Sequence, residues 1–597
     1  MHALNETKLP LLNWMMGGEA GYGVFTSGLI FSKCLSRGGY HTFSYKEYPS
    51  LIRGGHQSYQ VAASHDEIFS QYKELDMLVA LDELSIKMHR AEIKRNCAIM
   101  YDPKRVSNAR ALVKRNDILL VPIPLEKIAR DVSGSPLLKN TVAIGASCAL
   151  LHYGLSAFEG IMKDVFGHKG EHVVNENIRS AQHGYDYASL HFAKRFPKHL
   201  SPQKRGRTLM NITGNEAVAF GALQAGCTFY AAYPMTPASS LLSVMASHEL
   251  EYGVVVKHAE DEIAVINMAI GAAHAGARAM VGTAGGGFCL MTEGLGLAGM
   301  TETPIVIFIG QRGGPSTGLP TWTSQGDLKF ALSASQDDFP RIVYAPGDMR
   351  ELFYLTHEAL NIAERFQTPV MILSDTYLAE SHKSEIFFDT THLSVERGHI
   401  LNAQEVAEIQ RKAVKNRKFS PQDLPFKRYR FTSDPVSPRL LPGTKGGVFL
   451  ANSDEHDEYG STNEESKNRT GMMDKRRKKF LALQKEFPAP SWYGSRDAEV
   501  TVIAWGSTKL PALEALKHLP LTKANLLHFN RLSPLPFEKT MDALAKIKKA
   551  ILIEGNQSGQ FKNYLYEQTG FKPDQLLTKY NGRPFYPEEI VSAVSAF

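Results

Sequence analysis

Cysteine is scarce in this sequence, and its few cysteines are widely separated. The 597 residues include five of them: Cys34, Cys97, Cys148, Cys227 and Cys289. No two have the spacing of a metal-binding pair or of a Cys-x-x-Cys motif, and an odd number does not suit a disulfide framework. We therefore expect no zinc or iron–sulfur site built by this chain alone, and a reducing, cytoplasmic location.

The sequence also lacks a strong excess of charge of either sign. Its 67 Lys and Arg residues against 61 Asp and Glu residues give a formal net charge of +6, and the cations are scattered. Nucleic-acid-binding proteins usually gather positive charge on one face, so we expect no nucleic-acid partner. One dense basic run, residues 474–479, is interpreted as the solvated face of a helix.

Long hydrophobic runs are missing as well. The longest apolar stretches, such as residues 305–309, have the length of a β-strand, whereas a membrane span needs about 20 apolar residues. The first 16 residues show no basic segment followed by an apolar core. We therefore expect neither a signal peptide nor a membrane anchor.

What the sequence does contain is a repeated alternation of short apolar strands and helices. This alternation is typical of βα units, and it predicts an α/β fold with three parallel-sheet domains. Thr213 and Glu216 form a capping box at the start of one helix. The expected divisions are a first domain over 1–195, a basic linker over 196–208, a second domain over 209–383, an irregular charged and Pro-rich connection over 384–495, and a third domain over 496–597.

Within the connection, residues 454–458 read Asp-Glu-His-Asp-Glu. Acidic and histidine side chains can bind a metal ion. A single histidine on an exposed stretch is more simply explained as a solvated residue. We predict no metal site in this chain.

A glycine loop follows the first predicted strand, with Gly18, Gly21 and Gly23 ahead of a helix. Backbone N–H groups at such a turn can hold a phosphate. The glycine order is the reverse of the G-x-G-x-x-G dinucleotide motif, which disfavours a nicotinamide cofactor. A tight strand–helix turn and a phosphate-bearing ligand of another kind both stay open. In the second case Gly21, Gly23 and Arg53, from a nearby Arg-Gly-Gly loop, would supply the contacts.

The second segment places four unusual loops after successive strands, at the edge where open parallel sheets bind ligands. The first loop, residues 233–239, reads Tyr-Pro-Met-Thr-Pro-Ala-Ser. Its two prolines fix the backbone around Thr236 and aim the hydroxyl. An ordinary turn into a capped helix is the plainer alternative.

The second loop ends in Glu260, Asp261 and Glu262, directly before a strongly apolar helix. An acid at this position can simply complement the helix dipole. Glu262, however, shares a helix face with Ile266 and Ala269, so we expect it to point inward. Glu260 is its main competitor.

The third loop is the glycine run 285–287, and the fourth, residues 311–318, reads Gln-Arg-Gly-Gly-Pro-Ser-Thr-Gly. Arg312 in such a loop suits a bidentate contact with a carboxylate or phosphate, with a buried structural ion pair as the alternative. Together the four loops predict a small-anion site with a buried carboxylate. They do not identify the reaction.

Three of these features resemble the α subunits of 2-oxoacid:ferredoxin oxidoreductases: the loop 233–239, Glu262 with its apolar helix, and the loop 311–318. Met235 and Ala238 stand where that family usually has Ile and Ser, changes that leave Thr236 in place.

Other parts of the chain extend the resemblance. Residues 554–560 and 579–585 resemble the family's transketolase-C-terminal-like domain, and the first segment resembles its γ domain, often fused ahead of α in the 2-oxoglutarate enzymes. The resemblance therefore covers nearly the whole chain.

The resemblance implies a role for each candidate residue. Thiamine diphosphate would bind between the pyrimidine-binding second domain and a β subunit. Glu262 would hydrogen-bond the aminopyrimidine ring and favour the imino tautomer that leads to the nucleophilic ylide, and Arg312 would hold the substrate carboxylate. Further contacts would come from Tyr233 and Thr236 for the substrate and from Pro234, Gly285 and Gly286 for the cofactor.

The resemblance also implies partners and a reaction. A β subunit would carry Mg²⁺ and the iron–sulfur cluster, ferredoxin would accept the electrons, and αβ pairs would form dimers. The implied reaction converts 2-oxoglutarate and CoA to succinyl-CoA and CO₂. Three alternatives stay open: the same chemistry on pyruvate or another 2-oxoacid, a non-catalytic scaffold subunit, and, on the glycine loop alone, a nicotinamide-dependent dehydrogenase.

Overall fold

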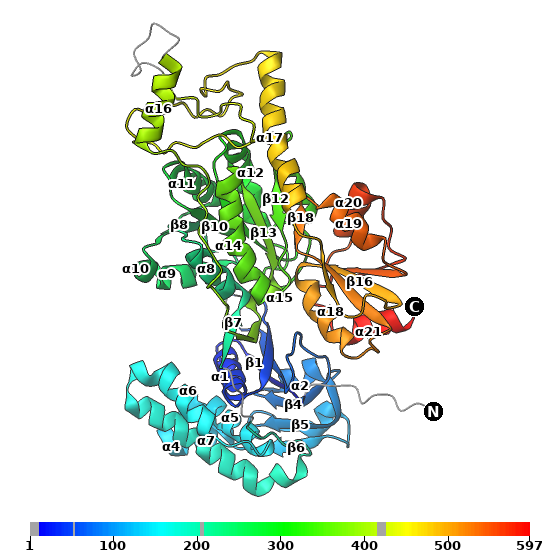
Figure 1. Ribbon diagram of the computed structural model, residues 1–597. Coiled ribbons are helices and arrows are strands. Elements are labelled where there is room, and N and C mark those ends of the chain that lie inside the picture. Colours follow the sequence, from blue (N-terminus) through cyan, green and yellow to red (C-terminus); the bar gives the residue numbers. More distant parts are fainter. Residues whose placement is uncertain (1–10, 52–53, 203–207, 415–425) are drawn as a thin grey trace.

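The computed structural model describes residues 11–51, 54–202, 208–414 and 426–597. It contains three β-sheets with their covering helices, which we call the first, second and third domains (Figure 1). The predicted α/β class with three sheet-based domains is thereby confirmed. Over these described ranges, no helix combines the length and apolar character needed to cross a membrane.

The first domain is built on an eight-stranded sheet. In spatial order its strands are β6 (Leu119–Pro122), β5 (Ile93–Tyr101), β4 (Leu75–Ala80), β1 (Leu12–Glu19), β3 (His56–Ser64), β2 (His41–Glu47), β14 (His382–Ile386) and β7 (Leu209–Thr213). Its helices are α1 (Val24–Arg37), α2 (Glu83–His89), α3 (Ala109–Val113), α4 (Leu125–Ser133), α5 (Lys139–Leu150), α6 (Ser156–Phe166) and α7 (Glu171–His191).

This sheet is mixed, whereas we expected a parallel one. β1, β4, β5 and β6 run parallel, but β3 is antiparallel to both β1 and β2. The cause lies in the sequence between β2 and β3: residues 48–55 are too few for a parallel crossover, which needs roughly a dozen residues or more.

Two strands tie the first domain to the second. β7 lies directly before the first helix of the second domain and β14 follows its last helix, yet the two pair with each other and β14 pairs with β2. The backbone N–H of Thr42 donates to Ser384 Oγ at 2.8 Å across this junction. The expected boundary between residues 208 and 209 thus falls beside a strand that belongs to the first sheet.

The second domain is built on a sheet that is parallel except at one edge. In spatial order its strands are β18 (Arg531–Ser533), β12 (Ile342–Tyr344), β13 (Val370–Asp375), β11 (Val306–Gln311), β10 (Ala279–Ala284), β8 (Phe229–Ala232) and β9 (Val255–His258). Its helices are α8 (Gly214–Gln224), α9 (Ser239–Ser247), α10 (Glu249–Tyr252), α11 (Glu262–His274), α12 (Gly285–Met300), α13 (Leu328–Ser333), α14 (Met349–Phe366) and α15 (Thr376–Glu380).

Helices cover both faces of this sheet, which explains its continuous apolar strands. Val306 and Phe308 of β11 pack with α8, α9 and α14, while Ile307 and Ile309 pack with α11 and α12. The capping box of Thr213 and Glu216 at the start of α8 is confirmed.

The third domain shares its core with the second. Its strands, in spatial order, are β15 (Ser491–Tyr493), β17 (Ala524–Phe529), β16 (Val500–Trp505), β19 (Ala550–Glu554) and β20 (Gln575–Thr578), and its helices are α18 (Lys509–Leu516), α19 (Phe537–Leu544), α20 (Gln560–Thr569) and α21 (Pro587–Ser595). Trp505 and Phe529 belong to the same apolar cluster as Ile307 of the second sheet. β18, from the third segment of the sequence, completes the second sheet.

The connection between these domains contains α16 (Ala403–Val414) and the 21-residue helix α17 (Ser466–Glu486), which runs along the second domain (Figure 1). Our interpretation of residues 474–479 as a solvated helix face holds for only half of them, since Asp474, Arg477 and Lys478 are exposed. Lys475, Arg476 and Lys479 are 4%, 3% and 1% exposed.

Glu302, which follows α12, is the counter-ion of the two buried lysines, whereas Arg476 pairs with Glu455. Its Oε1 pairs with Lys475, and its Oε2 lies 2.5 Å from Lys479 Nζ. Although burial by itself raises the pKa of Glu302, the two ammonium groups hold this pKa well below its usual range. His456, which we expected to be solvated, is also buried and packs on Tyr429 with ring centroids 4.1 Å apart.

We predict that Glu302→Gln destabilises the protein by about 3–5 kcal/mol, because it leaves two buried ammonium groups without their counter-ion. The thermal midpoint of unfolding measures the effect. Lys478→Gln, which removes an exposed charge from the same basic run, is the control. Equal midpoints for the two variants would show that Glu302 does not anchor α17.

Candidate active site at the carboxyl edge of the second sheet

Four loops meet at one edge of the second sheet. β9, β8, β10 and β11 are neighbours and run parallel, so their carboxyl ends lie side by side. The loop at Tyr233 follows β8, the acids 260–262 follow β9, the glycines 285–287 follow β10, and Arg312 follows β11. This is the edge at which open parallel sheets bind ligands.

Glu262 is the acid that points inward. It is the first residue of α11, after Asp261, whose side chain caps the helix by accepting from Ala264 N at 2.7 Å. Glu262 is 3% exposed, whereas Glu260 is exposed. Burial raises the pKa of Glu262, and the charge of Asp261 adds to that effect. Among the described residues, its buried Oε1 has no hydrogen-bond partner.

The glycine run at the start of α12 leaves room for carboxylates. A Cβ on Gly287 would lie 2.4 Å from Glu262 Oε1 and 2.2 Å from Thr283 Oγ1. A Cβ on Gly285 would lie 2.4 Å from Oδ2 of Asp327, a residue that the sequence patterns did not single out. Gly286, in contrast, has its nearest neighbour at 3.7 Å. Two of the three glycines are therefore required by the acids that rest on them.

Arg312 joins the fourth loop to the first. Its Nη1 donates to the backbone oxygen of Thr236 at 2.8 Å, and its Nε is buried without a hydrogen-bond partner among the described residues. Burial lowers the pKa of Arg312, and Asp327 counteracts this effect. This sheet edge thus carries a guanidinium with free hydrogen-bonding capacity, the buried carboxyl group of Glu262 and the carboxyl group of Asp327, whose Oδ2 is buried.

Comparison with known proteins gives a consistent result. Residues 220–475 match the family model described as pyruvate flavodoxin/ferredoxin oxidoreductase, thiamine diphosphate-binding, and residues 13–187 match the pyruvate ferredoxin/flavodoxin oxidoreductase model. A 2-oxoacid:ferredoxin oxidoreductase subunit alpha from Saccharolobus solfataricus is 32% identical, and the alignment covers 98% of this chain and 97% of that relative. The chain belongs to the 2-oxoacid:ferredoxin oxidoreductase family, as an alpha subunit.

Two further relatives of this oxidoreductase subunit carry more specific names. A 2-oxoglutarate synthase subunit KorA from Archaeoglobus fulgidus is 50% identical over 173 residues, which are 29% of this chain and 50% of that relative. A solved 2-oxoglutarate:ferredoxin oxidoreductase from Magnetococcus marinus, with 2-oxoglutarate, coenzyme A and succinyl-CoA bound, has a TM-score of 0.89 and 31% identity. The match covers 98% of this chain and 99% of that one.

The remaining candidate residues of the oxidoreductase subunit are placed as follows. Tyr233 is half-buried, with its ring centroid 6.4 Å from that of His258, and Pro234 is exposed. Gly21 and Gly23 belong to the first domain, where both adopt positive φ angles, of 91° and 74°. Arg53 lies outside the described residues.

The first domain nevertheless touches the four-loop edge. Thr321, shortly after the Arg312 loop, donates its hydroxyl to the backbone oxygen of Tyr48 at 2.6 Å. Tyr48 opens the same β2–β3 connection that contains the Arg-Gly-Gly sequence. The glycine loops of the first domain are linked as well, because Ala20 N donates to Gly55 O at 2.9 Å.

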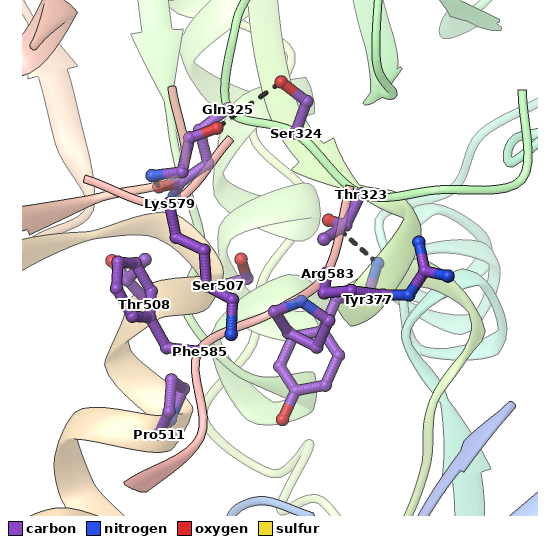
Figure 2. A pocket seen from close by; sticks show the side chains of 12 residues that line it. Thr323, Ser324, Gln325, Tyr377, Ser507, Thr508, Pro511, Lys579, Arg583 and Phe585 are labelled. Atoms are coloured by element: carbon purple, nitrogen blue, oxygen red, sulfur yellow. Dashed lines mark hydrogen bonds between the residues drawn. The ribbon is translucent and has the colours of Figure 1, made fainter. Parts of the chain in front are cut away.

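A small pocket marks the joint between the second and third domains (Figure 2). Its cations already have partners: Lys579 Nζ lies 2.7 Å from Glu589, and Arg583 pairs with Glu47 at 3.1 Å. Arg583 also stacks on the ring of Trp322. We interpret this pocket as a structural joint and not as a ligand site.

Gln325, on the wall of this pocket, is held by the third domain (Figure 2). Its backbone N–H donates to Gly555 O at 2.8 Å, its Nε2 donates to Trp505 O at 2.8 Å, and its Oε1 accepts from Gly555 N at 2.7 Å. The segment that leads to Asp327 is therefore fixed by the ends of β16 and β19.

We predict that Gly287→Ala destabilises this subunit by about 1–3 kcal/mol, because the added methyl group overlaps the carboxylate of Glu262. The thermal midpoint of unfolding reports the change. Gly286→Ala, one residue away in open space, should be neutral or slightly stabilising, since Ala is the better helix former. The packing argument fails if Gly287→Ala is as stable as Gly286→Ala.

Proposed function

We propose that this chain is the α subunit of a 2-oxoglutarate:ferredoxin oxidoreductase. The enzyme would convert 2-oxoglutarate and CoA to succinyl-CoA and CO₂, and would pass two electrons singly to ferredoxin. The observation that carries the proposal is that Oε1 of Glu262 and Nε of Arg312, on two loops of the same sheet edge, are both buried and have no hydrogen-bond partner among the described residues. The names of the Magnetococcus and Archaeoglobus relatives support 2-oxoglutarate, and pyruvate or another 2-oxoacid is the alternative.

The residues at this edge fit thiamine diphosphate. Glu262 offers a buried acceptor, Oε1, over the glycines of α12, where a planar aminopyrimidine nitrogen can donate to it. When bound, the cofactor supplies a nucleophilic carbon that attacks the 2-keto group. Glu262 would exchange a proton with the aminopyrimidine ring. A carboxyl group whose pKa is raised by burial suits this exchange. Pro234, Gly285 and Gly286 would line the cofactor.

Arg312 fits the carboxylate of a 2-oxoacid. Its hydrogen bond to Thr236 O fixes one edge of the guanidinium and leaves Nε free. A planar guanidinium can bind a carboxylate through two parallel hydrogen bonds. Thr236 and Tyr233 would complete the substrate pocket from the first loop.

The surface around Glu262 supports a β subunit as the second half of the site. Ile263 and Met268 of α11 and Leu290 of α12 are 53%, 45% and 49% exposed, and a Cβ on Gly271 would meet nothing within 4 Å. Exposed apolar side chains clustered on two adjacent helices are typical of a protein interface. The β subunit would carry Mg²⁺ and the iron–sulfur cluster, and two αβ pairs would form the dimer.

We assign the domains from the family-model matches. The family-model matches over 13–187 and 220–475 support a γ-type first domain and a pyrimidine-binding second domain, followed by a transketolase-C-terminal-like third domain. CoA would approach the site along the first domain, whose Tyr48 meets Thr321. The five thiols are free, which supports a reducing, cytoplasmic location.

Co-purification tests this proposal. The tagged chain should bring down a Cys-rich partner, and the complex should reduce viologen with 2-oxoglutarate and CoA. We predict that Glu262→Gln abolishes turnover while the complex still assembles, because the amide cannot exchange the proton. Glu260→Gln, with its exposed side chain, should keep activity. An intact complex that oxidises no 2-oxoacid would reject the proposed function in favour of a scaffold role.

We predict that Arg312→Ala mainly raises the KM for the 2-oxoacid, by about ten- to a hundredfold for a lost charged hydrogen bond of 1.5–3 kcal/mol, with a smaller change in kcat. Steady-state kinetics of the complex measure both constants. Arg350→Ala, which removes an exposed arginine elsewhere in the second domain, is the control. An unchanged KM in Arg312→Ala would remove Arg312 from the substrate pocket.

A further inference from the structure

Asp327 is a partly exposed acid beside the proposed substrate pocket, and one of its carboxyl oxygens, Oδ2, is buried. It lies between the Arg312 loop and α13, and its carboxyl group rests on Gly285 at the start of α12. Its backbone N–H donates to Gln311 Oε1 at 3.0 Å, and Gln311 directly precedes Arg312. Asp327 is thus linked to the third loop through Gly285 and to the fourth loop through Gln311.

The third domain holds the backbone on both sides of Asp327. The Gln560 side chain, at the start of α20, donates to Gly326 O at 2.7 Å and accepts from Lys329 N at 3.0 Å. These two backbone groups flank Asp327 in the sequence. Together with the bonds of Gln325 to Gly555 and Trp505, they leave the backbone at Asp327 little freedom to move.

The charge of Asp327 acts on Arg312 through space. Oδ2 of Asp327 and Nε of Arg312 are both buried, and neither has a hydrogen-bond partner among the described residues. Burial raises the pKa of Asp327 to about 6, against the opposing effect of the Arg312 guanidinium. Among the described residues, Cys289 on α12 also responds to the charge of Asp327: burial and Asp327 together raise the pKa of its thiol above the usual value. Glu262 rests on the same helix turn, at Gly287.

We propose that Asp327 is a positioning residue that competes with the substrate carboxylate for the charge of Arg312, and thereby sets how tightly the 2-oxoacid is held. The inference rests on the proposed function, since it takes Arg312 as the carboxylate-binding group. An internal anion near the guanidinium keeps this buried charge partly neutralised before substrate arrives. It also weakens the attraction that an incoming carboxylate experiences.

A pH dependence follows from this competition. When the substrate carboxylate occupies Arg312, less of the guanidinium charge remains to stabilise ionised Asp327, so its pKa rises further. Substrate binding then takes up a proton at pH values between the free and the bound pKa. Binding coupled to proton uptake weakens as pH increases. The KM should therefore rise as pH increases above about 6, by up to about tenfold for each unit by which the pKa is raised.

The test measures KM and kcat for 2-oxoglutarate in the purified complex from about pH 5.5 to about pH 8.5. For Asp327→Asn we expect a KM that is independent of pH and, near pH 8, severalfold below the wild-type value, with kcat changed much less. Asp338→Asn removes an exposed acid in the same domain and should keep the wild-type profile. Cys289→Ser should also keep it, because that thiol is neutral throughout.

Several outcomes would overturn the proposal. A wild-type KM that does not change with pH across this range would overturn it. This measurement needs no variant, so the proposal can be tested even if Asp327→Asn does not fold. An Asp327→Asn enzyme with the wild-type dependence of KM on pH would overturn it as well. So would an Asp327→Asn enzyme in which only kcat is reduced. A wild-type complex that oxidises no 2-oxoacid would instead reject the proposed function on which the inference rests, so the two failures are distinguishable.

Discussion

Two carboxyl groups rest on the first turn of α12, and the arrangement of the site depends on the absence of side chains beneath them. Glu262 occupies the space that a Cβ on Gly287 would fill, and Asp327 occupies the corresponding space at Gly285. Each acid has a buried carboxyl oxygen, and the N-terminal end of a helix favours negative charge. The glycine run therefore does more than allow a cofactor to approach: it determines where the acids of the site can stand.

The same constraint links three domains into one site. The acids lie at the carboxyl edge of the second sheet, but Gln325, two residues before Asp327, is held by the ends of two strands of the third sheet. The first domain meets the end of the Arg312 loop through Tyr48 and Thr321. A site assembled from loops of separate domains is sensitive to how those domains pack, and here the apolar core shared by Trp505 and Ile307 keeps that packing constant.

Buried charge recurs outside the site, with a structural purpose. Glu302 holds Lys475 and Lys479 of α17, and Glu364 of α14 pairs with Arg278, Arg397 and Arg439. Both acids lie on the second domain, and most of their partners lie on the connection between the second and third domains. Such pairs hold an irregular segment in one position, because separating the partners leaves an uncompensated charge buried away from water, which is energetically costly.

Several features of the fold and of the site could be predicted from the sequence alone. Strand and helix periodicity, the capping box at Thr213 and the four loops at strand ends were sufficient to predict three α/β sheets and the meeting of the four loops at one edge, because these signals are local. The direction of Glu262 followed from its helix face. The motifs of the second domain also pointed to the family that the comparisons then established.

What only the tertiary structure decided concerns residues whose partners are distant in the sequence. The basic run 474–479 looks solvated until Glu302 is brought against it. β7 joins the first sheet because β14, more than 150 residues later, returns to pair with it. Asp327 carries no motif, and its surroundings come from the fold: Gly285 lies beneath its carboxyl group, the charge of Arg312 acts on its pKa, and the third domain holds the neighbouring Gly326. The sequence by itself determined the elements and the chemical groups at their ends, since these depend on near neighbours. Which charges meet, and which of them are buried, depends on long-range packing and was decided by the fold.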